Sequence, residues 1–339
     1  MTSPADSEKY EFAGLRLERG QRARTRIRLA ELADGSSLEL PVMIIRGAQP
    51  GPVFYIGAGL HGDEVAGVQI VGRLITQLDA AALRGTLLLV PVQNPLAFQV
   101  QHRFFVGHML HSPMDQSPAD PWTSFPGDPN GNLAALIAHA LFEQLMRHAQ
   151  YMIDIHTPTT GGRYAPFAFL PLPRCGKSVL DAEALARTFG ADYILAADEG
   201  MYVDDKTPHT VLAERGIPAF GVEIGEGGRL EEADITIGLR GLMNVLKQVG
   251  MVPGKPEAFG RRTVIRSMEI TRATRGGILQ LHVSLNDDVR QGQKVASVIS
   301  PFGDVLEEIH ARHCGPVVRI ATLPIISSGE RVIQVGVPR

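Results

Sequence analysis

The fold is decided by residues 52–78, which read PVFYIGAGLHGDEVAGVQIVGRLITQL. Residues 52–60 form an apolar run ending in glycines, which is typical of a strand buried on both faces. From residue 64 onward the apolar side chains recur at helical spacing. The strand and the helix meet at His61-Gly62-Asp63-Glu64, the position where open α/β sheets place their ligand sites.

The same alternation of strand and helix continues along the chain. Continuous apolar runs predict strands at residues 85–94, 151–157 and 219–227, and helical periodicity predicts helices at 132–149, 178–190 and 233–251. An opening hairpin is expected at residues 25–31 and 38–46, around the turn Asp34-Gly35. These elements predict an α/β domain with a mixed sheet flanked by helices. The stretch from Phe98 to Gly131 has no clear period, and a loop of that length is typically functional or disordered.

The pattern changes around Val252-Pro253, after which short β runs are separated by glycine, asparagine and proline. We therefore expect two domains. Residues 1–252 form the α/β domain, in which 1–50 are an N-terminal β segment, and residues 253–339 form an all-β C-terminal domain.

Composition excludes several classes of protein. The 339 residues carry a net charge of −3, without the basic field that nucleic-acid binding requires. No stretch is apolar enough to span a membrane and no secretory leader is apparent, so we expect a soluble, cytoplasmic protein without membrane contact. The cysteines, Cys175 and Cys314, form no C-x-x-C pair. Any bound metal must therefore take nitrogen and oxygen ligands.

Three predicted strands end near residues suited to one hydrolytic site. His61 and Glu64 supply two of the three protein ligands that catalytic zinc favours, although pairs at this spacing also cap helices. His156 follows an apolar strand and is either a third ligand or a hydrogen-bonded core histidine. Asp154 points to the same side and is placed to orient His156. Glu223 lies between apolar residues of the last strand, so it either has a specific partner or acts on a water activated by the metal.

Five motifs together resemble a known family. HGDE, NPLAF, FPGDPNG, DIHT and VEIGEGG, in this order, are similar to the succinylglutamate desuccinylase and aspartoacylase family, a branch of the zinc-carboxypeptidase-like fold. The resemblance covers nearly the whole chain. It implies that His61, Glu64 and His156 bind one Zn²⁺ per chain and that Glu223 is the general base. It also implies that Asn94 and Arg103 lie near the substrate.

One departure from the family pattern concerns the substrate. Where the family has an Asn-Arg pair before FPG that binds a carboxylate, this chain has Trp122-Thr123-Ser124. Neither Trp122 nor Thr123 provides the bidentate fork of an arginine. Arg163 is the first candidate to replace it and Arg103 the second. Otherwise the substrate lacks a carboxylate there and Trp122 offers it an apolar or stacking surface.

The C-terminal region resembles the β barrel-sandwich domain that biotinyl and lipoyl carriers share with this family. Between Gly276 and Val317 its one lysine, Lys294, lies in a predicted strand rather than at a hairpin tip, so we expect no carried cofactor. The region is expected to shape the entrance of the site or to form an oligomer contact, which leaves a homo-oligomer open.

These observations predict a zinc-dependent hydrolase that cleaves the amide bond of an N-acyl amino acid or similar small amide, other than a peptide bond. Two alternatives stay open: a zinc peptidase acting on small peptides, and a catalytically silent binding protein on the same fold. The sequence does not identify the acyl group or the amine.

Overall fold

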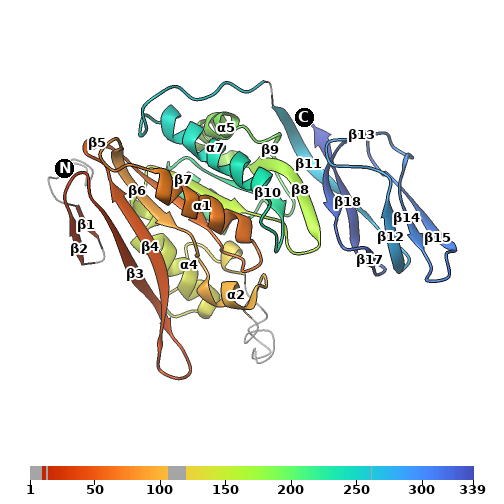
Figure 1. Ribbon diagram of the computed structural model, residues 1–339, viewed down its shortest axis with the longest axis horizontal. Coiled ribbons are helices and arrows are strands. Elements are labelled where there is room, and N and C mark those ends of the chain that lie inside the picture. The colour runs from red at the N-terminus through yellow and green to blue at the C-terminus, as the bar shows by residue number, and fades with distance from the viewer. Residues whose placement is uncertain (1–9, 13, 106–119, 261) are drawn as a thin grey trace.

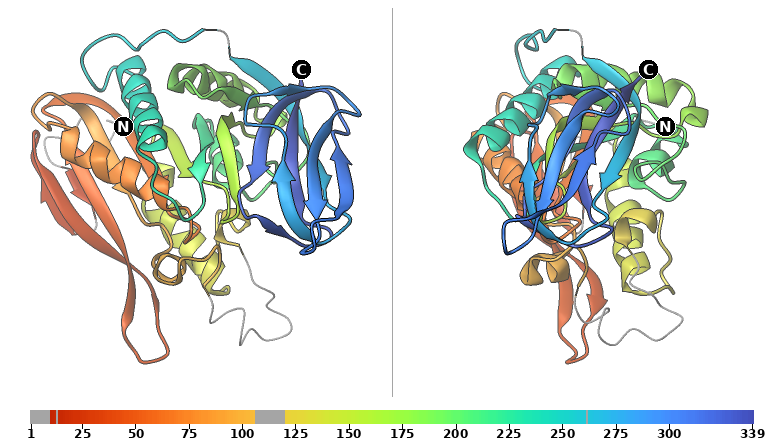
Figure 2. Two further views of the ribbon diagram at one scale, coloured as in Figure 1. Left: turned by 45° about the vertical axis from the view of Figure 1, so that its right-hand side comes forward. Right: turned by 90° about the vertical axis from the view of Figure 1, so that its right-hand side faces the viewer.

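The computed structural model describes residues 10–12, 14–105, 120–260 and 262–339. Its centre is one long mixed sheet with the strand order β13-β16-β18-β11-β9-β8-β10-β7-β5-β6-β4-β3 (Figure 1). The N-terminal hairpin and the C-terminal strands lie at opposite ends of this sheet, and helices cover its middle (Figure 2). The middle of the irregular stretch between Phe98 and Gly131, residues 106–119, lies outside the described residues.

The middle of the sheet consists of parallel strands, as the strand and helix order predicts. Strand β5 pairs in parallel with β6 and β7, and β7 pairs in parallel with β10. A strand that the sequence did not reveal, β8, pairs antiparallel with β10 and parallel with β9. The strands are β5 (Gln49–Ala58), β6 (Arg84–Val90), β7 (Tyr151–His156), β8 (Gly162–Phe169), β9 (Tyr193–Leu195) and β10 (Ala219–Glu226).

The expected opening hairpin is present at one end of the sheet. Its strands pair antiparallel, and the second of them pairs with β6. A separate two-stranded sheet precedes it. These strands are β1 (Tyr10–Phe12), β2 (Leu15–Leu17), β3 (Arg22–Glu31) and β4 (Ser37–Arg46).

Helices cover both faces of the sheet and bury two separate cores. Apolar residues of α1, α5 and α7 pack on one face, and those of α4 and α6 pack on the other. The helices are α1 (Val65–Gln77), α2 (Pro95–Val100), α4 (Leu133–Gln144), α5 (Lys177–Phe189), α6 (Pro208–Ala213) and α7 (Glu232–Gln248), with 3-10 turns η2 (Pro121–Thr123), η3 (Met146–His148) and η4 (Pro173–Cys175). Within the described ranges no helix is long and apolar enough to cross a membrane.

The alternation of side chains along the strands decides which face carries the polar residues. In β7, Ile153 and Ile155 join the core under α1 and α7, whereas Met152 belongs to the opposite core. Asp154 and His156 therefore lie on the α4 side, together with Met152. The same alternation in β10 places Glu223 on that side.

The C-terminal strands β11, β16 and β18 continue the central sheet rather than standing apart from it. Strand β11 pairs in parallel with β9, and β16 pairs antiparallel with β8. The remaining strands enclose a third apolar core. They are β11 (Thr263–Arg272), β12 (Gly277–Leu281), β13 (Asp288–Val289), β14 (Lys294–Ile299), β15 (Val305–His310), β16 (Gly315–Ala321), β17 (Ile325–Ile326) and β18 (Arg331–Pro338).

Two glycines allow the packing of the central sheet to be tested. A Cβ on Gly221 in β10 would lie 2.0 Å from the Phe169 ring, whereas a Cβ on Gly72 in α1 meets nothing within 4 Å. We expect Gly221→Ala to destabilise the protein by about 1–3 kcal/mol through overpacking. Gly72→Ala should stabilise it by about 0.5–1 kcal/mol because alanine favours a helix. Thermal unfolding midpoints should shift in opposite directions, and a neutral Gly221→Ala would contradict the packing.

Candidate metal centre and active site

His61 and Glu64 lie in the tight connection between β5 and α1. Glu64 is the N-cap residue of α1. Gly62 permits the connection to pass close to α2, because a Cβ there would lie 1.8 Å from the carbonyl oxygen of Ala97. The Gly62 amide donates to the carbonyl oxygen of His102 at 3.1 Å. These contacts direct both side chains toward the carboxyl ends of β7 and β10.

The other two candidates lie side by side on neighbouring strands. His156 is the last residue of β7, and it is paired in parallel register with Glu223 of β10. The register shifts between Glu223 and Gly225, where Gly225 has a φ of +85°. Glu223 is therefore the last regularly paired residue before the bulge.

His61, Glu64 and His156 form a compact cluster. Their nearest ligand atoms all lie within 4.8 Å of one another. Glu64 is placed between the two rings: Oε1 lies 2.6 Å from His61 Nδ1, and Oε2 lies 2.8 Å from His156 Nδ1. Each of the three residues is at most 2% exposed. Two imidazoles and one carboxylate are a donor set typical of catalytic zinc.

The outer nitrogen of each ring is held by a second carboxylate. His61 Nε2 lies 3.0 Å from Asp120 Oδ1, and His156 Nε2 lies 2.9 Å from Asp154 Oδ2. Gln93 Nε2 in turn donates to Asp154 Oδ1 at 2.6 Å. When Nε2 donates its proton outward, the Nδ1 lone pair is available to a metal, which is the usual arrangement around ligating histidines. The residues present therefore fit a divalent cation.

The carboxylates set the ionisation of the cluster. Burial alone would raise the pKa of Glu64, but His61 and His156 outweigh this effect and lower that pKa to about 2. Burial opposes the charged form of His156, yet Asp154 and Glu64 hold its pKa well above the usual value. The cluster thus stabilises positive charge beside Glu64, as a metal site must.

Glu223 differs from Glu64 in its surroundings. Burial, and then repulsion from Glu64, raises the pKa of Glu223 to about 8. Its Oε1 lies 3.0 Å from the Tyr202 hydroxyl, whereas its Oε2 is buried with no hydrogen-bond partner among the described residues. An oxygen left without a partner is free to exchange a proton with a ligand.

A chain of hydroxyl groups connects Glu223 to the C-terminal strands. The Tyr202 hydroxyl lies 3.1 Å from that of Tyr164, which donates to Gln334 Oε1 at 2.7 Å. Each hydroxyl has one hydrogen to donate. With Glu223 protonated at Oε1, every link has a donor: Glu223 to Tyr202, Tyr202 to Tyr164, and Tyr164 to Gln334. With Glu223 ionised, Tyr202 turns to donate to the carboxylate.

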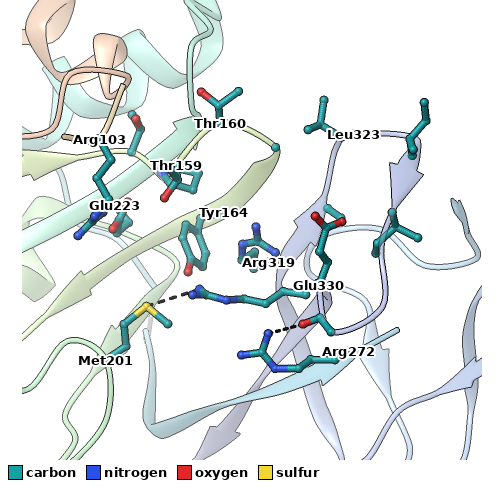
Figure 3. A pocket seen from close by; sticks show the side chains of 18 of the residues that line it. Arg103, Thr159, Thr160, Tyr164, Met201, Glu223, Arg272, Arg319, Leu323 and Glu330 are labelled. Atoms are coloured by element: carbon teal, nitrogen blue, oxygen red, sulfur yellow. Dashed lines mark hydrogen bonds between the residues drawn. The ribbon is translucent and has the colours of Figure 1, made fainter. Parts of the chain in front are cut away.

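A cavity of about 600 Å³ opens in front of Glu223. Arg103, Thr157 and Glu223 line its inner end, and residues of the C-terminal strands line the opposite wall. Figure 3 shows Arg103 and Glu223 on one side, Tyr164 in the middle, and Arg319 and Arg272 on the other side. The C-terminal strands therefore shape the entrance to the site.

Arg103 and Arg163, the two arginines singled out from the sequence, differ in their positions. Arg103 lines the cavity, where Nη2 donates to Asp120 Oδ2 at 2.8 Å and Nη1 lies 3.7 Å from Glu64 Oε1. Arg163 Nη2 instead donates to both carboxylate oxygens of Asp234, at 3.0 and 2.9 Å. Arg163 is not among the described residues that line the cavity, so its placement gives no support to a role in binding substrate.

Asn94 and Trp122 also lie behind the cavity wall rather than on it. Asn94 is the N-cap residue of α2 and accepts from the Ala97 amide at 3.2 Å. Trp122 is 6% exposed, and its ring meets that of His156 edge-on at 6.1 Å between centroids. These contacts are those of packing residues that hold the loop and His156 in place.

Sequence reasoning missed Asp120, Tyr164 and Tyr202. Asp120 stands 59 positions from His61, and the two tyrosines lie in segments without a recognised motif. The one available signal was that Asp120-Pro121 is a typical start for a helical turn. Asp120 does cap η2 by accepting from the Trp122 amide at 3.0 Å.

Comparisons with known proteins agree with this geometry. Residues 50–249 match the model of the succinylglutamate desuccinylase/aspartoacylase catalytic domain. The chain therefore belongs to the succinylglutamate desuccinylase/aspartoacylase family.

Individual relatives and a solved structure extend the match. The chain is 29% identical to an N-alpha-acetyl-L-2,4-diaminobutyric acid deacetylase of Halomonas elongata over 267 residues, which cover 76% of this chain and 73% of the relative. A succinylglutamate desuccinylase of Erwinia tasmaniensis is 29% identical over 129 residues, 34% of this chain and 35% of that protein. A Rhodobacter sphaeroides structure of the family superposes with a TM-score of 0.79 at 24% identity, covering 95% of this chain and 98% of that one. The fold is thus shared along nearly the whole chain.

The metal centre can be tested by zinc content. His61→Ala and His156→Ala each remove one nitrogen ligand, so each variant should lose tight zinc binding. His148→Ala is the control, because His148 is exposed and contacts only its own segment. Elemental analysis of the folded variants should give about one zinc per chain for wild type and control. Full zinc in both ligand variants would contradict the assignment.

Proposed function

We propose that this protein is a zinc-dependent hydrolase that cleaves the amide bond of an N-acyl amino acid or similar small amide. The observation that carries the proposal is the free Oε2 of Glu223 at the inner end of the cavity, beside the His61, Glu64 and His156 cluster. The deacetylase and desuccinylase relatives support amide hydrolysis. A zinc-carboxypeptidase-like fold is part of the same proposal, with residues 1–252 as the catalytic domain.

Zinc bound by the three residues would polarise the amide carbonyl, make a water more acidic, and lower the pKa of Glu223 by its positive charge. Glu223 would take a proton from the attacking water at Oε2 and deliver it to the leaving nitrogen. Tyr202 stabilises the ionised carboxylate by donating to Oε1. When Glu223 holds the proton at Oε2, its Oε1 still accepts from Tyr202, so Tyr202 holds the carboxyl group in both states of the base.

Arg103 would act at the other side of the reacting bond. Its Nη2 is bound to Asp120, Nη1 lies 3.7 Å from Glu64 Oε1, and the side chain lines the cavity. A guanidinium has five donors, so several remain for a substrate oxygen. We propose that Arg103 orients the substrate, and that Asp120 fixes both Arg103 and His61.

The two alternative functions, a catalytically silent binding protein and a peptidase of small peptides, are less well supported. A silent binding protein has no need of a buried, partly unpartnered carboxylate at the end of a cavity, because such a group costs free energy. A peptidase of small peptides would use the same centre and differs only in the group that flanks the amide. The experiments below measure turnover of small amides, which a silent binding protein would not show.

Glu223→Gln tests the general base. The amide keeps the shape and the Tyr202 contact but cannot accept a proton, so turnover should fall by about 100-fold or more. Zinc content and the unfolding midpoint should stay near those of wild type. Glu226→Gln is the matched control, because Glu226 stands beside Arg163 and Arg229 and is not among the described residues lining the cavity. Turnover that survived in Glu223→Gln would contradict the assignment.

Tyr202→Phe tests whether the Tyr202 hydroxyl lowers the pKa of Glu223. The Tyr202 hydrogen bond lowers the pKa of Glu223 against the effect of burial. Removing it should raise that pKa, so the ionised base is lost at a higher pH and the acidic limb of the kcat/KM profile moves upward. A hydrogen bond to a charged group contributes about 1.5–3 kcal/mol, which corresponds to a loss of about 10-fold or more at neutral pH. An acidic limb at the wild-type position would show that the bond does not act on the base.

A further inference from the structure

The cavity wall opposite Glu223 carries a cluster of arginines from the C-terminal strands. Arg319 lies on β16, Arg331 is the first residue of β18, and Arg272 is the last residue of β11. All three line the cavity that reaches Glu223. Figure 3 shows Arg319 and Arg272 across the cavity from Glu223 and Arg103.

This arrangement brings like charges together. Arg272 and Arg331 are direct cross-strand partners in the antiparallel pair of β11 and β18, where like charges are destabilising. Burial, together with the neighbouring Arg331, lowers the pKa of Arg319. The arginines therefore repel one another, and Arg319 is in addition partly desolvated, whereas Arg272 is exposed.

The described part of the chain supplies no carboxylate partner to these arginines. Arg272 Nη1 donates to the Gly329 carbonyl at 2.7 Å, and Arg331 Nη1 lies 3.6 Å from the sulfur of Met201. Arg319 Nη1 is buried with no hydrogen-bond partner.

The two carboxylates of the cavity wall have other partners. Glu223 accepts from Tyr202, and Glu330 accepts from the Ser327 amide. An unpaired guanidinium inside a protein is costly, so the cluster is suited to an anion supplied from outside.

The position of Arg319 is built by its neighbours. Strand β16 is paired with β8, and this pairing places Arg319 opposite Tyr164. Gly162 leaves room for the guanidinium, because a Cβ there would lie 2.4 Å from Nη2. Gly162 has no positive φ in this structure, so its lack of a side chain serves the close approach and not the backbone conformation.

We propose that Arg319 and Arg331, with Arg272 beside them, bind a carboxylate of the substrate across the cavity from Glu223. This inference rests on the proposed amide hydrolysis and names its substrate class: small amides bearing a carboxylate away from the scissile bond. Arg163 is bound to Asp234 and Arg103 to Asp120, so neither is as free as Arg319 to replace the missing Asn-Arg pair. The carboxylate belongs either to the amino acid or to a dicarboxylic acyl group.

Kinetics with matched substrates test the site in the zinc-loaded full chain. One pair compares an N-acetyl amino acid with its C-terminal carboxamide, and a second compares an N-succinyl alkylamine with its succinamoyl analogue. If the wild-type enzyme has a higher kcat/KM for the carboxylate form than for the carboxamide form of one pair, that pair identifies which half of the substrate carries the carboxylate. Arg319→Ala should lower kcat/KM for the carboxylate form of that pair by about 10- to 100-fold, the loss of a charge-assisted hydrogen bond, and barely change the carboxamide.

Two further variants distinguish loss of carboxylate binding from a general structural effect of the Arg319 substitution. Gly162→Ala should displace the Arg319 guanidinium and give the same selective loss with every charge retained. Arg290→Ala is the control, because Arg290 is an exposed arginine of the same region outside the cavity-lining residues. It should behave as wild type. Equal losses on carboxylate and carboxamide substrates in Arg319→Ala would overturn the proposal.

Binding to the metal-free full chain separates this inference from the proposed function. Without metal, a carboxylate cannot bind zinc, so calorimetric titration with succinate and with N-acetyl amino acids reports binding by the protein's own groups, and the difference between wild type and Arg319→Ala reports the contribution of Arg319. Wild type and Arg290→Ala should bind at least one of these probes, and Arg319→Ala should bind it about 10-fold or more weakly. Binding without turnover of any amide would reject hydrolysis and keep the anion site. Turnover with no binding difference among the variants would reject the anion site and keep hydrolysis.

Discussion

The structure depends on one buried carboxylate, that of Glu64. It is 1% exposed, and a charge so deeply buried is tolerated only when it is fully paired. Each of its oxygens meets an imidazole, and each imidazole is held from behind by Asp120 or Asp154. Removing any member leaves a buried charge without compensation, so the loop after β5, the end of β7 and the segment before η2 must all be positioned together.

Local backbone features allow these three segments to meet at Glu64. Parallel strands end at one edge of the sheet, and alternation sends Asp154, His156 and Glu223 to the face covered by α4 and α6. Glycines remove the atoms that would obstruct the approach, as at Gly62 beside α2. The raised pKa of Glu223 and the low pKa of Glu64 follow from this placement, because the first carboxylate has one tyrosine partner and the second has two histidines.

The C-terminal strands take part in the site as well as in the fold. Through β11 and β16 they extend the central sheet, and through Gln334 and Tyr164 they contact the hydrogen-bond chain that ends at Glu223. They also form the cavity wall opposite Glu223. Lys294 begins β14 and forms a salt bridge with Glu308, away from that wall. Residues on both sides of the domain boundary expected near residue 252 therefore line the same cavity.

The sequence by itself determined the alternation of the main strands and helices, although not β8, β9 and α6, and the positions of His61, Glu64, His156 and Glu223 near strand ends. These features follow from local periodicity and short motifs, and the structure brings the four residues together. Only the tertiary structure decided that Asp120 and Tyr202 join them, that Arg163 is bound to Asp234, and that Arg319 faces the cavity. Such contacts join segments far apart in the chain. They depend on strand register and on the pairing of β16 with β8, which no local pattern encodes.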